Sequence, residues 1–335
     1  MTNANFKRFF DEVIVPAQTS TKESFKKVPV PDGVSDEAKL FIMGDKGPTP
    51  PVDVFDKAQR TVVRTFINSM WHSAEQHLDI EHTARHEPIA GVSCKVFTPK
   101  QLENKKQKLL YLHGGAYWLG SAEANSSIAI SMADKSGLEV ISVDYRLAPE
   151  HPYPAALEDT IAVYKAILAS GTAPRNIAII GDSAGGGLAL ASVINIISQG
   201  LPKPAATGLI APWADLTFSG DSHKINNMYA DSRLSVEGLQ GPAKAYAGNL
   251  ALSDPNVSPL FADLRGLPPT LIQVGSREIL LSDATRLTKR AQEAGVEVTL
   301  NVFEAMWHVW QFYPHLPEGT QALQEMTTFL KNHMA

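Results

Sequence analysis

The chain has 335 residues, of which 44% are hydrophobic, and it carries 30 basic and 35 acidic side chains for a formal net charge of −5. This composition is typical of a folded globular protein with one large or two ordinary domains, and it excludes a disordered or collagen-like chain. The mildly acidic balance, without a Lys/Arg-rich run, argues against nucleic acid as the main partner. We expect a cytoplasmic protein, because we find neither a membrane span nor a signal peptide and the single cysteine, Cys94, fits a reducing compartment.

The first 60 residues differ from the rest of the chain, since they are rich in Lys, Asp and Pro. Two helices are predicted there, at residues 5–15 and 55–72, on either side of a Gly/Pro-rich run at 47–51. Residues 1–60 are therefore interpreted as an appendage, the N-terminal part of a helical cap.

From residue 90 onward, short apolar segments alternate with longer helical patterns. Strands are predicted at residues 92–97, 108–112, 139–143, 176–180, 207–211, 270–274 and 296–303. Helices are predicted at residues 122–135, 154–170, 184–198, 282–294 and 320–333, with Ser282 as an N-cap and Gly295 after the helix end. The alternation predicts βαβ units and an α/β fold with a mostly parallel sheet covered by helices on both faces.

One interruption breaks this rhythm at residues 215–256, where helical pieces occur without an obvious strand. We interpret this segment as a cap insertion that, with residues 1–60, covers the carboxyl edge of the sheet, where open α/β sheets bind ligands. The core is then formed by residues 61–214 and 257–335.

The strongest chemical signal is the G-x-S-x-G sequence at residues 181–185, between a predicted strand and a predicted helix. A sharp strand-to-helix turn lifts the hydroxyl of Ser183 above the sheet, and it needs glycine on both sides because neighbouring backbone comes close. The N–H of Ala184, in the first turn of the helix, would face a developing oxyanion. Ser183 is therefore the candidate nucleophile.

A second signal, HGGAYW at residues 113–118, follows the predicted strand 108–112. Successive glycines at a strand end expose N–H groups that the sheet does not use, and those of Gly115 and Ala116 would stabilise an oxyanion. His113 is expected to brace this loop by hydrogen bonding rather than to act on the substrate.

The serine needs a base, and His308, after the last predicted strand, is the best placed of the ten histidines. The orienting carboxylate is expected after the strand 270–274, where Glu278 and Asp283 are candidates and Glu304 is a weaker third. We favour Glu278 because it lies in the loop, whereas Asp283 falls in a helix first turn, where an acidic residue commonly stabilises the helix dipole.

Four further histidines, at positions 72, 77, 82 and 86, do not keep to one helical face. Their spacing therefore predicts no metal site, and we expect no cofactor.

Together these sequences resemble the bacterial hormone-sensitive-lipase-like esterases, over about residues 90–315. The resemblance rests on HGGA at 113–116, GDSAGG at 181–186 and the block DYRLAPEHPYPAALED at 144–159. It implies an α/β-hydrolase fold with a helical cap, Ser183 as nucleophile, His308 as base, Glu278 as acid, and oxyanion donors at Gly115, Ala116 and Ala184. Two departures stand out: Ala116 replaces the usual third glycine, and Glu278-Ile279-Leu280 replaces the usual Asp-Pro-Leu.

The resemblance implies hydrolysis of small esters by a serine carboxylesterase, with a pH–rate limb at roughly pH 6–7 from the base. Members often pair through the last strand and helix, so a homodimer is compatible with the sequence. Bulky apolar residues beside the motifs suggest a pocket for short acyl chains, with Trp118, Trp213 and Val309 as substrate-binding candidates and Met306, Trp307 and Phe312 nearby. Two alternatives stay open: lactone or amide hydrolysis by the same triad, and a non-catalytic small-molecule receptor.

Overall fold

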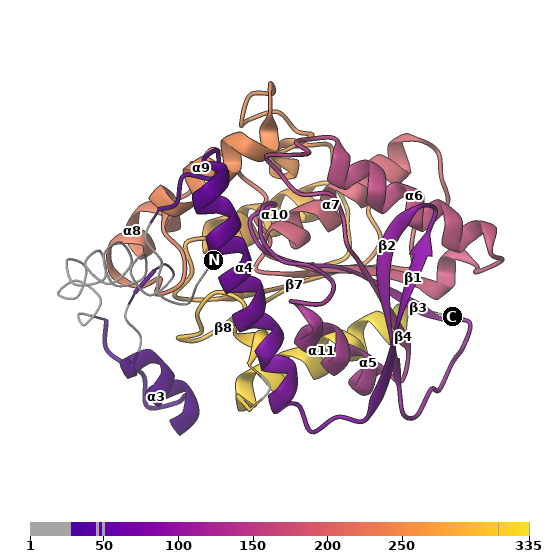
Figure 1. Ribbon diagram of the computed structural model, residues 1–335, viewed down its shortest axis with the longest axis horizontal. Coiled ribbons are helices and arrows are strands. Elements are labelled where there is room, and N and C mark those ends of the chain that lie inside the picture. The colour runs from indigo at the N-terminus through magenta and orange to yellow at the C-terminus, as the bar shows by residue number, and fades with distance from the viewer. Residues whose placement is uncertain (1–27, 45–46, 49–50, 314, 335) are drawn as a thin grey trace.

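A computed structural model describes residues 28–44, 47–48, 51–313 and 315–334 (Figure 1). The helix predicted at residues 5–15 lies outside these residues. The helix predicted at 55–72 is present as α4 (Lys57–His72), and its N-cap is Asp56, whose side chain accepts hydrogen bonds from the N–H groups of Ala58 and Gln59.

An eight-stranded sheet forms the centre, with the strand order β1-β2-β4-β3-β5-β6-β7-β8. β2 pairs antiparallel with both β1 and β4, and every pairing from β4 to β8 is parallel. The strands are β1 (His82–Ile89), β2 (Val92–Pro99), β3 (Lys108–Leu112), β4 (Glu139–Val143), β5 (Ile177–Asp182), β6 (Ala206–Ile210), β7 (Thr270–Gly275) and β8 (Val298–Phe303). All seven predicted strands are confirmed, with small shifts at their ends.

β1, the edge strand, was not predicted from the sequence. Its sequence HTARHEPI is mostly polar and contains Pro88, and most of its residues are exposed. An edge strand tolerates both features because one side of its backbone has no strand to pair with. The hydrophobic alternation that identifies a half-buried strand is therefore absent.

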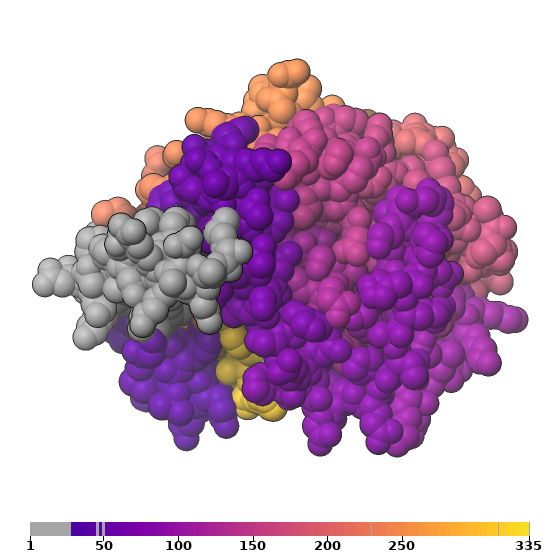
Figure 2. All heavy atoms as spheres, in the orientation of Figure 1, coloured from indigo at the N-terminus to yellow at the C-terminus, as the bar shows by residue number. Residues whose placement is uncertain are grey.

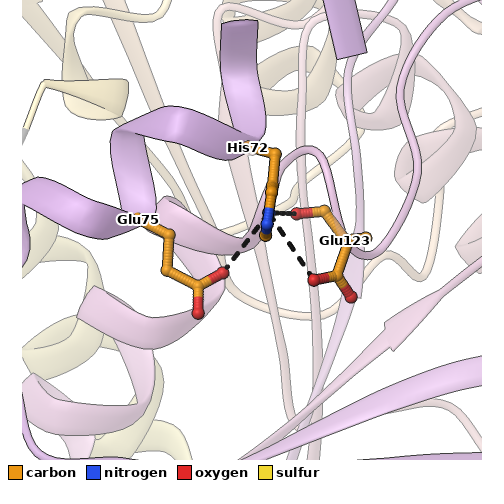
Figure 3. Close-up of side chains that lie close together, drawn as sticks. All are labelled: His72, Glu75 and Glu123. Atoms are coloured by element: carbon orange, nitrogen blue, oxygen red, sulfur yellow. Dashed lines mark hydrogen bonds and ion pairs between the residues drawn. The ribbon is translucent and has the colours of Figure 1, made fainter. Parts of the chain in front are cut away.

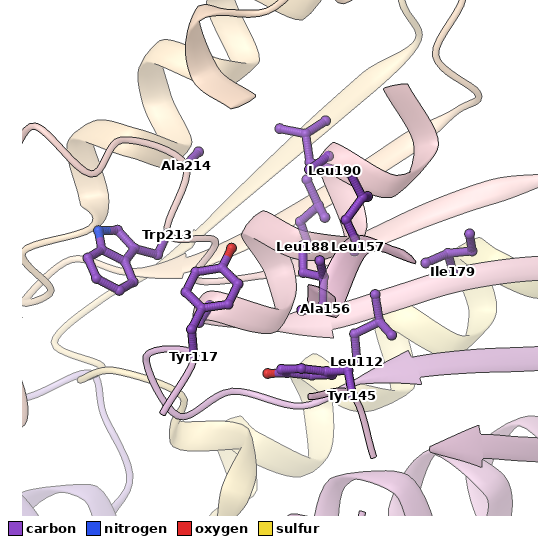
Figure 4. Close-up of a cluster of buried hydrophobic side chains, with 14 of the residues drawn as sticks. Leu112, Tyr117, Tyr145, Ala156, Leu157, Ile179, Leu188, Leu190, Trp213 and Ala214 are labelled. Carbon is purple, nitrogen blue, oxygen red and sulfur yellow. The ribbon is translucent and has the colours of Figure 1, made fainter. Parts of the chain in front are cut away.

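Alternate residues of the parallel strands point to opposite faces of the sheet. On β3, Leu109 and Tyr111 pack in one core cluster with α5 and α11, whereas Leu110 and Leu112 pack in another with α6, α7 and α10. Figure 1 shows these two helical layers on either side of the sheet, and Figure 4 shows part of the second core around Leu112. The covering helices are α5 (Ser126–Ser136), α6 (Ala155–Ala169), α7 (Ala184–Ser198), α10 (Leu281–Glu293) and α11 (Pro317–His333).

Three predicted helix starts need correction, the simplest being α11, which begins at Pro317 rather than at residue 320. α10 begins at Leu281, so Ser282 is not its N-cap; the Ser282 hydroxyl instead accepts a hydrogen bond from the N–H of Ser222, across 2.9 Å. α5 begins at Ser126 rather than at residue 122, because residues 121–125 form a turn in which the Asn125 side chain accepts the N–H of Ser121. Gly295 follows the end of α10 with φ +77°, as expected for a residue beyond a helix end.

Further helices lie over the carboxyl edge of the sheet, from two distant parts of the chain. They are α3 (Asp36–Gly44), α4, α8 (Ser222–Tyr229) and α9 (Val236–Ala247). In the space-filling view the indigo N-terminal residues lie beside the orange segment that carries α8 and α9 (Figure 2). Assignment of residues 1–60 and 215–256 to one cap stays our proposal; α4 itself continues past residue 60.

Within the interruption at 215–256 the chain forms α8 and α9 and no strand, as predicted. Short 3-10 turns complete the fold: η3 (Ser73–His77), η4 (Pro174–Asn176), η5 (Pro259–Phe261) and η6 (Trp310–Phe312). None of the helices in the described part of the chain combines the length and apolarity needed to cross a bilayer.

Candidate active site

Ser183 lies at the turn between β5 and α7 in a strained backbone conformation, with φ 54° and ψ −122°. The flanking glycines are required by close backbone contacts. A Cβ atom on Gly185 would lie 2.0 Å from the carbonyl oxygen of Leu112, and one on Gly181 would lie 2.2 Å from the carbonyl oxygen of Gly185. Strain of this kind persists only where the surroundings enforce it, and here it presents a serine at the carboxyl edge of the sheet.

His308 and Glu278 meet in the loops that follow β8 and β7. The Nδ1 atom of His308 lies 2.7 Å from Oε2 of Glu278, and the other carboxylate oxygen accepts the N–H of Gly275 across 2.6 Å. Glu278 is fully buried. The carboxylate therefore fixes the imidazole ring and favours the tautomer with its proton on Nδ1, which leaves Nε2 free to accept a proton.

The other two candidate carboxylates do not contact His308. Asp283 accepts the N–H groups of Ala214 and Asp215, each across 2.9 Å. Glu304 is exposed on the surface. Of the three carboxylates considered, Glu278 is thus the one that is hydrogen-bonded to the histidine.

Burial determines the electrostatics of this pair. Loss of water contact lowers the pKa of His308 to about 4, an effect that the charges of Asp231 and Asp182 oppose and that of Arg233 reinforces. Burial likewise raises the pKa of the Glu278 carboxyl well above its usual range. The imidazole is therefore neutral at pH 7 and can act as a base.

The loop after β3 is shaped for close approach to Ser183. Gly115 has φ +124° and Ala116 has φ 51°. A Cβ atom on Gly114 would lie 2.2 Å from Oδ2 of Asp182. Within the described residues neither the Gly115 N–H nor the Ala116 N–H meets a hydrogen-bond acceptor, so both are free to bind an anion. The N–H of Ala184 is also free of a helical partner, because it lies in the first turn of α7.

Buried side chains that the sequence analysis did not single out hold this loop. Asp182 accepts the Gly114 N–H across 2.9 Å and the Tyr111 hydroxyl across 2.6 Å, and burial raises its pKa to about 6. The Tyr145 hydroxyl donates to the carbonyl of His113 across 2.5 Å. His113 stacks on Tyr145 and bonds through Nδ1 to the Gly114 carbonyl, so its predicted bracing role is confirmed.

A second buried carboxylate, Asp231, holds the loop that carries Glu278. Asp231 lies between α8 and α9 and accepts the N–H groups of Arg233, Leu234 and Ile279 across 2.7–2.8 Å. Burial raises its pKa to about 6. No local pattern could reveal this role, since the contact with Ile279 joins segments 48 residues apart in the sequence.

A cavity of about 660 Å³ opens at these residues, and its wall includes Ser183, His308 and residues 114–116. Trp118 and Val309, two of the predicted substrate-binding residues, line it, as do Trp307 and Phe312.

The third predicted substrate-binding residue, Trp213, does not line this cavity. It is 1% exposed and packs in the core near Tyr117 (Figure 4), and its ring centroid lies about 6 Å from those of Tyr117 and Phe218. Met306 is fully buried and likewise lies outside the cavity wall. Both residues follow strand ends, as predicted, but their side chains are buried in the core rather than exposed to the cavity.

Two groups of side chains in the described residues combine histidine with carboxylates in the way that metal sites do. In the first, Asp215, His223 and Asp283 are fully buried around the guanidinium of Arg286, which lies 2.8 Å from one carboxylate and 3.3 Å from the other. The arginine supplies the positive charge, so this group is a buried ion-pair network. The second group is His72, Glu75 and Glu123, whose chain neighbours Ser73 and Asn125 line the cavity.

A parallel sheet with a serine at a strained strand-to-helix turn is the architecture of an α/β hydrolase. A family described as alpha/beta hydrolase fold matches residues 109–312. An esterase of Acinetobacter venetianus is 42% identical over 243 residues, which are 72% of this chain and 79% of that protein. An acetyl-hydrolase of Streptomyces hygroscopicus is 42% identical over 224 residues, 67% of this chain and 75% of that protein.

Solved structures agree with these relatives. An esterase from the bacterial hormone-sensitive lipase family has a TM-score of 0.78 and 38% identity over 82% of this chain and 92% of that one. Esterase E25 has a TM-score of 0.84 and 31% identity, over 92% of this chain and 97% of that one. The chain belongs to the α/β-hydrolase fold family and, within it, to the hormone-sensitive-lipase-like carboxylesterases.

Proposed function

We propose that this protein is a serine carboxylesterase that hydrolyses short-chain esters through an acyl-enzyme. One observation carries the proposal: the His308–Glu278 hydrogen bond of 2.7 Å lies at the same cavity as the strained Ser183. The esterase and acetyl-hydrolase relatives agree with it.

In the first half-reaction, Nε2 of His308 takes the proton of the Ser183 hydroxyl as its oxygen attacks the ester carbonyl. The negative charge on the carbonyl oxygen is stabilised by the N–H groups of Gly115, Ala116 and Ala184. His308 then returns the proton to the leaving alcohol. Glu278 stabilises the imidazolium that forms in between.

Water repeats the sequence on the acyl-enzyme. His308 takes a proton from the water, the tetrahedral intermediate forms at the same N–H groups, and the carboxylic acid leaves as the proton returns to Ser183. Each group acts twice, so the two half-reactions need no additional residue.

A preference for short acyl chains is supported by the bulky side chains beside the nucleophile. Trp118 follows the oxyanion loop directly, and its carbonyl accepts a hydrogen bond of 2.8 Å from Nε of Arg64 in α4. This bond ties the backbone of the loop at Trp118 to α4, so that this part of the wall has little freedom to retreat from a long chain. Faster hydrolysis of palmitoyl than of butyryl esters would contradict this part of the proposal.

The proposal is tested by steady-state hydrolysis of p-nitrophenyl butyrate by the wild type, by Ser183→Ala and by the control Ser198→Ala, which removes a hydroxyl at the exposed end of α7. We expect activity in the wild type and the control and none in Ser183→Ala. Equal activity in Ser183→Ala, or none in the wild type, would contradict the proposal. Rates on a lactone and on an anilide, measured in parallel, distinguish ester from lactone or amide hydrolysis.

A further inference from the structure

The second histidine–carboxylate group is built from two segments that are distant in the sequence, the end of α4 with the adjoining η3 and the turn before α5 (Figure 3). His72 ends α4, Glu75 lies in η3, and Glu123 lies in the turn before α5. Each offers one ligand atom, and the three atoms lie within 4.8 Å of one another. Ser73 and Asn125, close to these residues in the chain, line the cavity.

The distances suit a metal ion. Nδ1 of His72 lies 3.6 Å from Oε2 of Glu75 and 3.5 Å from Oε1 of Glu123. Two ligands that each lie about 2.1 Å from a tetrahedral zinc ion are about 3.4 Å from each other. The distance from His72 to each carboxylate therefore suits a zinc ion, and all three ligand atoms lie within 4.8 Å of one another.

Two more histidines, His82 and His86 on β1, lie beside the group. His82 and His86 are four residues apart on this strand and so project from the same face. Nε2 of His82 lies 3.8 Å from Oε1 of Glu75, and Nε2 of His86 lies 3.8 Å from Oε2 of Glu123. Spacing along a helix could not predict this convergence, because the two residues belong to a strand.

The carboxylates are held in place by groups behind them. The Ser126 hydroxyl donates to Oε2 of Glu75 across 2.7 Å, and the ammonium of Lys95 lies 2.5 Å from Oε2 of Glu123. Lys95 thus occupies one oxygen of Glu123 and leaves Oε1 facing His72. The two carboxylates and the one ammonium carry a single net negative charge, which favours a cation.

We propose that His72, Glu75 and Glu123 form a binding site for a divalent transition-metal cation of the zinc type. Imidazole together with carboxylate suits zinc better than magnesium or calcium, which prefer oxygen ligands alone. Since the side chains of His72 and Glu123 are 43% and 42% exposed, an ion can enter from solvent and water can complete its coordination. The bound ion would join the end of α4 to the turn before α5, and both segments adjoin the cavity.

The experiment is calorimetric titration of the chelator-treated full chain with zinc chloride and, separately, with magnesium chloride. We expect one zinc ion per chain, no binding of magnesium at the same concentrations, and a melting temperature raised by a few degrees at saturating zinc. Absence of zinc binding, or equal binding of magnesium, would overturn the proposal.

Zinc titrations of variants test whether the ion binds at these residues. His72→Ala and Glu123→Gln should each weaken zinc binding at least tenfold, and Ser126→Ala, which removes the hydrogen bond behind Glu75, should weaken it by roughly tenfold. His333→Ala is the matched control, since it removes a histidine 3.2 Å from a glutamate elsewhere on the chain.

Circular dichroism and hydrolysis of p-nitrophenyl butyrate show whether each variant is folded. If His72→Ala or Glu123→Gln does not fold, Ser126→Ala still tests the site. Unchanged zinc affinity in the folded variants of the site, or an equal loss in His333→Ala, would show that the ion binds elsewhere and would overturn the proposal.

Discussion

Replacement of Glu278 by glutamine tests the proposed catalytic pair most sharply. The amide has nearly the same shape as the carboxylate, so the loop after β7 should keep its conformation. What changes is the charge that faces His308 across 2.7 Å, and one of the two acceptor oxygens, which now accept from Gly275 N–H and from His308, becomes an NH2 donor. The uncharged amide can no longer stabilise the imidazolium that the reaction creates.

The size of the effect follows from the geometry. The charge centres of the carboxylate and of the imidazolium are separated by about 4 Å, and two unit charges at that distance attract by about 4 kcal/mol at an effective dielectric constant of about 20. A loss of this size corresponds to a decrease of roughly 1000-fold in kcat. KM should change little, because the imidazole is neutral when the substrate binds.

The free energy of unfolding should respond much less than kcat does. Because burial raises the pKa of Glu278, the folded state holds its proton more tightly than the unfolded state does, so this residue costs stability as the pH rises above its unfolded value. Glu278→Gln removes that cost but leaves one buried N–H donor, of Gly275 or of His308, facing the amide NH2, so the two effects oppose each other and the melting temperature at pH 8 should stay close to that of the wild type. The assays are steady-state kinetics with p-nitrophenyl butyrate and thermal unfolding. A decrease in kcat of less than tenfold in a folded variant would refute the assignment.

Further predictions concern the base His308, the carboxylate of Asp231 that supports the Glu278 loop, the strand-to-helix turn around Ser183 (the elbow) and the pocket. The acidic limb of kcat/KM should lie near pH 4 rather than pH 6–7, because burial lowers the pKa of His308 to about 4 and activity rises as the imidazolium loses its proton. Asp231→Asn should lower kcat roughly tenfold at unchanged KM, since the acid loop loses a charged acceptor. Gly185→Ala should prevent folding or destabilise the protein by more than about 3 kcal/mol in chemical denaturation, because the new Cβ would lie 2.0 Å from a backbone oxygen. Trp118→Ala should shift the preference among p-nitrophenyl esters toward longer chains, whereas Trp213→Ala should cost about 3–5 kcal/mol of stability without that shift.

Each of these predictions has either a matched control variant or a result that would contradict it. A limb at pH 6–7 would mean that the histidine is not desolvated in the working enzyme. An Asp231→Asn variant whose KM rises while kcat holds would place that carboxylate in substrate binding instead. For the elbow, Gly44→Ala is the control, since an added Cβ there has no atom within 4 Å. If Trp213→Ala alters chain-length preference as Trp118→Ala does, the cavity extends further than described.

The parts of the molecule that the sequence predicted are those with a local cause. Continuous apolar runs identified the central strands because both faces of each are covered by helices. The glycines around Ser183 marked the elbow because their requirement is a contact within the turn itself. The sequence of β1 shows no such local pattern, because an exposed edge strand can be polar and can contain a proline such as Pro88.

The parts that the sequence did not predict depend on contacts between distant segments. Asp231 supports the acid loop through the N–H of Ile279, a residue that stands where related esterases usually have proline and therefore no donor. Trp213 was expected at the substrate because it follows a strand end, yet the chain there turns it into the core. Proximity in sequence predicts which elements meet at the carboxyl edge of the sheet, but the direction of each side chain follows from packing.

The central claim, that Ser183 is the residue acylated during turnover, is tested most directly by covalent labelling. The wild type and Ser183→Ala are incubated with a p-nitrophenyl phosphonate, and their intact and peptide masses are measured. The mechanism predicts one adduct per wild-type chain on the peptide that contains Ser183, loss of esterase activity in step with labelling, and no adduct in Ser183→Ala. An adduct on another residue, or full activity in a fully labelled enzyme, would contradict it.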